Sequence, residues 1–338
     1  MSRSSLLAGL GILYLTATFL VIQYDRFRLL DPAGLDAWYR TKLAGLLTEG
    51  DQYRIGMPYL AHFIEAHTAI GMRQCIPFIE AISFGLGLVC LYHLLVRSPL
   101  YQAGSTRQRT ADLGFFFCVL QFPVLWIFPW ERPETLPTFC FLAAITVIIL
   151  EARVPLAIGC ILAVLLSFLQ ALNRTDAPMI VGLSACLASL LFPLYRRRAA
   201  TALLGVLCGA TGAATQLYLQ HLFPLSHSGQ KGTMFQFFYN FNPRYGFAPY
   251  RMPAFVVALI PLLATLMLLR RRDVGLDPTD RFTLLIALIY LPVYMAFGII
   301  SEVRIYVPYL FLLAPLLAKV WVAFLTGWRT ELQPEKLA

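Results

Sequence analysis

Charged residues are scarce in this chain, and the short motifs of several enzyme classes are missing from it. Only 13% of the 338 residues are Asp, Glu, Lys or Arg. The sequence has no HExxH motif, no glycine-rich phosphate loop and no GxSxG motif. None of the seven cysteines forms a CxxC pair, and most lie in apolar runs, where a thiol serves as a small apolar side chain. No local signal therefore points to a zinc peptidase, a P-loop enzyme, a serine hydrolase or a dithiol redox protein.

The abundant residues are apolar. Hydrophobic residues make up 59% of the chain, and the mean hydropathy is +0.68. A soluble domain cannot hide so much apolar surface, so the composition predicts an all-α, polytopic integral membrane helix bundle. No shift in composition marks a soluble domain, so residues 1–338 are expected to form a single transmembrane domain. The formal charge of +9 is explained by basic cytoplasmic turns, and we expect no nucleic-acid partner.

Apolar segments predict about ten transmembrane helices, since a bilayer is crossed by about 20 residues of helix. Residues 5–24 lack a small-x-small cleavage site and are interpreted as a retained first helix rather than a signal peptide. Residues 58–71 are amphipathic and are expected to lie at the interface or to lead into the next span. The ten predicted spans are residues 5–24, 77–96, 113–129, 136–150, 154–172, 179–195, 199–222, 253–269, 282–300 and 305–327.

Basic residues gather on alternate turns between these segments. The positive-inside rule assigns such turns to the cytoplasm. With ten spans, both termini then lie in the cytoplasm of a multi-pass membrane protein, with a bacterial inner or plasma membrane as the expected location. The basic residues in question are Arg97, Arg107, Arg109, Arg153, Arg196, Arg197, Arg198, Arg270, Arg271, Arg272, Arg281, Arg329 and Lys336.

Two long polar loops, residues 25–59 and 223–252, fall on the opposite, extracytoplasmic side. A long charged loop beside a bilayer needs a reason, and we interpret the two loops as the cap of an active site. The first loop contains Asp25, Asp31, Asp36, Arg40, Tyr53 and Arg54, and the second contains Arg244. Aromatic residues beside basic ones in the second loop suit either a sugar phosphate or an interfacial helix.

The short extracytoplasmic turns share a pattern in which an arginine lies close to a carboxylate. Charges can gather at helix ends simply because water is near. The positive-inside rule disfavours arginine on this side, however, and ionisable groups at membrane depth usually face a cavity. The guanidinium fork binds phosphate oxygens in pairs. We therefore expect a phosphate site formed by Arg132 with Glu134, Arg174 with Asp176, and Arg304 with Glu302.

A metal site has little support. His62, Glu65 and His67 look like possible ligands, but residues five apart on a helix point about 140° away from each other. We assign no metal-binding residues. A divalent cation stays open as a cofactor.

The first polar loop and the segment after it contain LDAWYR at 35–40, LLTEGDQYR at 46–54 and MPYL at 57–60. These stretches resemble the first outer loop of the GT-C superfamily of membrane glycosyltransferases, and the many-span plan resembles that superfamily more loosely. Two features differ: the loop has no adjacent pair of acidic residues, and the chain ends soon after the last apolar segment.

The resemblance implies inverting transfer of a sugar from a polyprenyl-phosphate donor to a hydroxyl of a glycan, lipid or protein acceptor, in cell-envelope glycan biosynthesis. Asp36 would be the general base, with Asp31 and Asp25 as substitutes. Arg132, Arg174 and Arg304 would stabilise the leaving phosphate, supported by Arg54 and Arg244. Glu134, Asp176 and Glu302 would orient the arginines or bind sugar hydroxyls, and Arg40 and Tyr53 would contact substrate.

Two other functions are compatible with the sequence. One is a polymerase or ligase of lipid-linked glycans, which the short second loop disfavours. The other is a transporter or flippase of a lipid-linked substrate, although no pair of broken helices near the midplane is evident.

Overall fold

A computed structural model describes residues 3–29, 32–47, 53–127, 134–224, 259, 262–263, 265–267, 269–270, 275–297 and 306–326. Within these ranges the regular elements are helices and no strand occurs, which confirms the all-helical prediction. The helices are α1 (Arg3–Leu29), α2 (Pro32–Leu43), α3 (Gly56–His67), α4 (Met72–Arg97), α5 (Pro99–Ala103), α6 (Thr106–Ile127), α7 (Thr135–Leu150), α8 (Leu156–Asn173), α9 (Asp176–Leu191), α10 (Arg198–Leu222), α14 (Pro278–Phe297), α15 (Val307–Leu312) and α16 (Ala314–Thr326).

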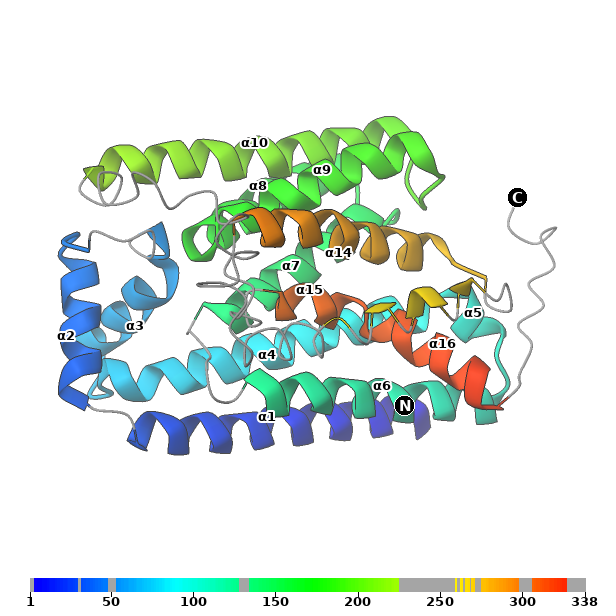
Figure 1. Cartoon of the computed structure of the whole chain (residues 1–338), viewed down its shortest axis with the longest axis horizontal. Helices are drawn as coiled ribbons and strands as arrows, with labels where there is room; N and C mark the ends of the chain where they lie inside the picture. The colour runs from blue at the N-terminus through cyan, green and yellow to red at the C-terminus, as the bar shows by residue number, and fades with distance from the viewer. Residues whose placement is uncertain are drawn as a thin grey trace, which may run out of the picture.

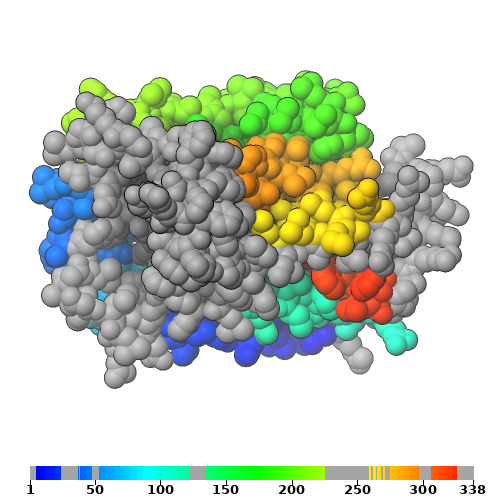
Figure 2. Space-filling view, viewed as in Figure 1, coloured from blue at the N-terminus to red at the C-terminus, as the bar shows by residue number. Residues whose placement is uncertain are grey.

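Most of the long helices run roughly along one axis (Figure 1). Helix α1 begins, and α16 ends, at the right of the picture, which we call the terminal end. Helices α2 and α3 lie across the axis at the left, which we call the loop end. Figure 2 shows α10 and α1 at opposite edges of one face, with α14 between them.

Five helices are long and apolar enough to cross a membrane, and three shorter helices are also apolar. This agrees with a membrane-embedded helical protein. The five candidate spans are Ser5–Gln23, Met72–Arg97, Leu156–Asn173, Arg198–Leu222 and Pro278–Ala296, and the shorter helices are Thr135–Leu150, Asp176–Leu191 and Ala314–Leu325. The total of ten spans remains a prediction, because most of the segment 253–269 lies outside the described residues.

Two predicted boundaries differ from the structure. Helix α1 continues to Leu29, so Asp25 belongs to a helix and not to a loop, and α2 and α3 make much of the stretch 25–59 helical. The predicted span 305–327 is divided into α15 and α16 by a turn at Leu313. Pro315 explains the break, since proline has no N–H to donate to Phe311 and its ring crowds that carbonyl.

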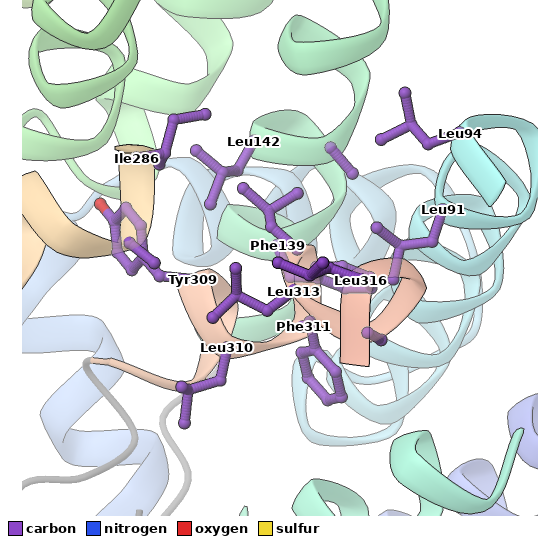
Figure 3. Packing of buried hydrophobic residues seen from close by; sticks show 14 of the residues in the cluster. Leu91, Leu94, Phe139, Leu142, Ile286, Tyr309, Leu310, Phe311, Leu313 and Leu316 are labelled. Atoms are coloured by element: carbon purple, nitrogen blue, oxygen red, sulfur yellow. The ribbon is translucent and has the colours of Figure 1, made fainter. Parts of the chain in front are cut away.

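The core between the helices is apolar and aromatic (Figure 3). Phe84 of α4, Phe139 of α7 and Phe311 of α15 have ring centroids 4.7–6.2 Å apart, within the range of favourable aromatic pairs. Leucines from α4, α7 and α16 surround them (Figure 3). Three segments far apart in the sequence are thereby held together in the middle of the bundle.

Helices α9 and α10 approach each other through small residues. A Cβ atom added to Gly182 of α9 would lie 2.5 Å from the backbone oxygen of Gly205 on α10. Without side chains at this contact, the two backbones can pack closely, which is a common way for membrane helices to associate.

Replacing Gly182 with alanine should therefore separate α9 from α10 and lower the free energy of unfolding by about 1–3 kcal/mol. Thermal unfolding of the detergent-solubilised protein measures the loss. Gly209→Ala is the matched control, because a Cβ there meets nothing within 4 Å. Equal melting temperatures for the two variants would contradict the close packing.

At the terminal end, α14 begins with a reciprocal cap. The Asp280 backbone N–H donates to Asp277 Oδ1 at 2.9 Å, and the Asp277 N–H donates to Asp280 Oδ2 at 3.2 Å. Pro278 occupies the first helical position, where no N–H is needed. The sequence DPTD thus forms a capping box that fixes the start of α14.

The other oxygens of both aspartates bind Lys319 of α16. Lys319 Nζ lies 3.0 Å from Asp277 Oδ2, 2.6 Å from Asp280 Oδ1 and 3.0 Å from Ser98 Oγ. Ser98 Oγ in turn donates to Asp277 Oδ2. Burial alone would raise the pKa of Asp277, but the Lys319 ammonium and the Ser98 hydroxyl hold it below its usual value. The three donors of the ammonium are all used, so this lysine lock ties α16 and α14 to the end of α4.

Lys319→Met should lower the free energy of unfolding by about 3–5 kcal/mol, because two carboxylates stay buried without their shared cation. Chemical or thermal unfolding in detergent measures this. Adding Asp280→Asn to the Lys319→Met protein should restore part of the loss by removing one unbalanced charge. A Lys319→Met protein as stable as the parent would show that the lock does not stabilise the bundle.

Candidate functional site at the loop end

The first pair of the site joins the segment before α3 to the start of α7. Arg54 Nη1 lies 2.7 Å from Glu134 Oε1. Glu134 directly precedes α7, and its side chain is 8% exposed, against 25% for Arg54. The negative carboxylate is well placed there, since the N-terminus of a helix carries partial positive charge.

The second pair is formed by the turn between α8 and α9. Arg174 follows the last residue of α8, and Asp176 is the first residue of α9. Arg174 Nε donates to Asp176 Oδ1 at 3.1 Å, and Nη2 donates to Asp176 Oδ2 at 2.5 Å. This is the two-point geometry that a guanidinium makes with a carboxylate. Arg54 is within electrostatic reach of Asp176, so the two pairs form one cluster.

Arg174 contacts a group of stacked tyrosines through Tyr290. Arg174 Nη2 donates to the Tyr290 hydroxyl, and its guanidinium lies 5.7 Å from the centroid of that ring. Tyr309 stacks on Tyr290 with centroids 3.6 Å apart. Tyr294 and Tyr306 stack 5.8 Å apart in the same group, and all four side chains are at most 2% exposed. We call Tyr290, Tyr294, Tyr306 and Tyr309 the tyrosine stack.

The charge on Arg174 is firmly fixed. Burial by itself would lower the pKa of this guanidinium, but the Asp176 carboxylate, followed by Tyr290 and Tyr309, raises the pKa well above its usual value. Arg174 therefore stays cationic at any physiological pH, and its ring stacking and hydrogen bonds set its orientation.

Several buried polar atoms around the cluster have no hydrogen-bond partner among the described residues. Gln170 Oε1 and Asn173 Oδ1 belong to the last turn of α8, just before Arg174. Thr138 Oγ1 lies one turn after Glu134 in α7, and the Tyr53 hydroxyl neighbours Arg54. Such groups are rare in folded proteins and usually mark bound water, an ion or a ligand. These residues adjoin the ion-pair residues along the chain, so the loop end has polar groups that a polar ligand could use.

The structure brings together four of the residues predicted to form the site: Arg54, Glu134, Arg174 and Asp176. Tyr53 is buried against Leu219 and Phe223, while Arg40 lies exposed on α2 and makes no ion pair or hydrogen bond with the four. Asp36 lies in α2 and Asp25 in α1, but their side chains are not described. Asp31, Arg132, Arg244, Glu302 and Arg304 lie outside the described residues.

The tyrosine stack was missed by the sequence reasoning, although a signal was present. Tyr290 and Tyr294 are four residues apart, and Tyr306 and Tyr309 three apart, so each pair shares one helix face. A tyrosine in an apolar segment also needs a partner for its hydroxyl. The sequence could not show that the face with Tyr290 and the face with Tyr309 meet next to Arg174.

The histidines of α3 have contacts on their own helix. His62 Nδ1 lies 3.7 Å from Glu65 Oε2, and His67 Nδ1 is 2.8 Å from the Phe63 oxygen on its own helix. In the part of the chain that the structure describes, no group of three or more His, Cys, Asp or Glu could hold a metal ion.

No protein-family model, curated protein or solved structure matches the chain.

Gly56→Ala tests how tightly α3 is fitted to this site. A Cβ at Gly56 would lie 2.7 Å from Asn173 Oδ1, so α3 or the Asn173 side chain must move, at about 1–3 kcal/mol of stability. Hydrogen exchange at residues 56–67 should become faster. Gly71→Ala is the control, because its Cβ would meet nothing within 4 Å. An unchanged rate of hydrogen exchange in α3 would show that the contact between Gly56 and Asn173 is loosely packed.

Proposed function

We propose that this chain is a GT-C-like membrane glycosyltransferase that moves a sugar from a polyprenyl-phosphate donor to an acceptor hydroxyl at the loop end. The observation that supports this best is the joint presence of two arginine–carboxylate pairs and several buried polar atoms that have no partner among the described residues. Phosphate and sugar hydroxyls together supply the anionic and hydrogen-bonding groups that such a site would take.

In this proposal Arg54 and Arg174 face the leaving phosphate, whose negative charge grows as the glycosidic bond breaks. Glu134 and Asp176 orient the two guanidinium groups, and the tyrosine stack keeps Arg174 from moving. Gln170, Asn173 and Thr138 hydrogen-bond the sugar. Arg132, Arg244 and Arg304, with Glu302, complete the phosphate site from the other extracytoplasmic segments.

The general base in this proposal is Asp36, with Asp31 and Asp25 as substitutes. Helix α2, which carries Asp36, crosses the loop end of the bundle (Figure 1). A carboxylate there can take the proton of the acceptor hydroxyl as that oxygen attacks the anomeric carbon from the face opposite the phosphate. Transfer of this kind inverts the configuration of the sugar.

The same proposal places the loop end outside the cytoplasm. Exposed arginines gather on the turns of the terminal end, among them Arg107, Arg153, Arg197 and Arg281. The positive-inside rule then puts this end, with both chain termini, in the cytoplasm of a ten-span protein. A cysteine-labelling experiment at Arg281→Cys and Arg40→Cys in sealed vesicles distinguishes the two sides.

Turnover of the reconstituted full-length protein tests the proposal. With a panel of radiolabelled polyprenyl-phosphate sugars, Asp36→Asn should lower transfer about 10²–10⁴-fold, the usual contribution of a general base. Arg174→Lys should raise the donor KM about tenfold, because lysine lacks the two-point donor geometry. Arg281→Lys, an exposed arginine at the opposite end, should leave both parameters unchanged.

Other outcomes reassign the function. Normal turnover by Asp36→Asn removes Asp36 as the base, and an unchanged donor KM in Arg174→Lys removes the phosphate role of Arg174. Movement of an intact lipid-linked sugar across the bilayer without a covalent product identifies a flippase. Products of many lengths identify a glycan polymerase.

A further inference from the structure

Arg196 is a buried cation that forms no ion pair with the residues that the structure describes. It lies between α9 and α10 at the terminal end and is only 8% exposed. Its Nη2 donates to the Val154 backbone oxygen at 2.8 Å, while its buried Nε has no hydrogen-bond partner within the described ranges. None of the carboxylates in the described ranges forms an ion pair with it. A buried charge left unpaired is strongly unfavourable, so Arg196 points to an anion that binds the protein from outside.

The guanidinium of Arg196 lies against the first turn of α8. Its Nη2 would be 3.5 Å from a Cβ atom on Gly159, and Val154 lies two residues before this helix. Neither α8 nor α10 has a side-chain cap at its N-terminus. The uncapped N–H groups of a helix N-terminus attract anions, phosphate in particular. Two such ends therefore meet beside the unpaired Arg196.

Exposed arginines surround this position. Arg153, Arg197 and Arg198 are exposed, and their side chains make no ion pair with the described residues. Glu151, two residues before Arg153, is already paired with Arg97. Positive charge thus exceeds negative charge around Arg196, and the excess faces solvent or lipid headgroups.

Apolar side chains adjoin the same turns. Leu190 and Leu191 end α9, and Ile158 lies in the first turn of α8, all with exposed side chains. An anion with a hydrocarbon tail can place its charged group at Arg196 and its chain along these residues. Free phosphate would use only the charged half of the surface, so a lipid fits better.

We propose that Arg196, with the N-termini of α8 and α10 and the flanking Arg197 and Arg198, binds the phosphate headgroup of an anionic membrane phospholipid. The acyl chains lie along Leu191 and Ile158. This site is at the opposite end of the bundle from the proposed transferase site and does not depend on that activity.

Native mass spectrometry of the full-length, detergent-solubilised protein tests the site by titration with phosphatidylglycerol, phosphatidylcholine or inorganic phosphate. Phosphatidylglycerol should bind most tightly, because the choline group of phosphatidylcholine is repelled by the arginines. The double variant Arg197→Gln/Arg198→Gln should weaken phosphatidylglycerol binding about tenfold through loss of charge-assisted contacts. Arg196→Gln should weaken it at least as much.

The matched control is Arg270→Gln/Arg281→Gln, which removes the same charge from exposed arginines at the same end. It should bind phosphatidylglycerol like the parent. An equal loss in the control, or no loss in Arg197→Gln/Arg198→Gln, overturns the site. Binding of inorganic phosphate as tight as that of phosphatidylglycerol overturns the lipid as its source. The double variant keeps the test valid should Arg196→Gln fail to fold.

Discussion

The main constraint on this structure is that a charge inside an apolar helix bundle must be paired or kept at the ends. Moving an ion away from water is unfavourable by several kcal/mol, and the penalty is offset only where partners of opposite charge and hydrogen bonds are in place. Lys319, one of the most deeply buried charges, meets Asp277, Asp280 and Ser98 together. Arg174 meets Asp176 and Tyr290 at the opposite end. Between these ends, the core is built from aromatic and branched apolar side chains.

The two ends satisfy this constraint to different degrees. At the terminal end, each aspartate of the lysine lock uses one oxygen to cap α14 and the other to bind Lys319. Nothing is left over for a ligand, and the lock is structural. At the loop end, Gln170 and Asn173, which precede Arg174, have buried oxygens that find no partner in the described part of the chain. A site that must accept a polar group needs such unused acceptors, so the incomplete end supports the functional proposal.

Arg54 and Arg174 are each paired with a carboxylate, which changes how they can act on a phosphate. Because Glu134 and Asp176 hold them, the arginines would already be in position when the donor that we propose binds. The pairs are not isolated from each other, since Arg54 also acts on Asp176 electrostatically. Arg196 is the contrasting case, as a buried guanidinium that forms no ion pair with the described residues. The two proposed sites thus differ in whether a carboxylate of the protein holds the arginine.

The sequence by itself determined the helical membrane class, most helix positions and the arginine–carboxylate spacing at Arg174 and Asp176. These follow from local properties: hydropathy over about 20 residues and charges two residues apart on one turn. Tertiary structure decided the rest. The pairing of Arg54 with Glu134, the meeting of Tyr290 with Tyr309 and the capture of Lys319 by Asp277 each join residues many positions apart. Which faces of two apolar helices meet depends on packing of the whole bundle, because a helix of similar hydrophobicity all round gives no sign of its partner.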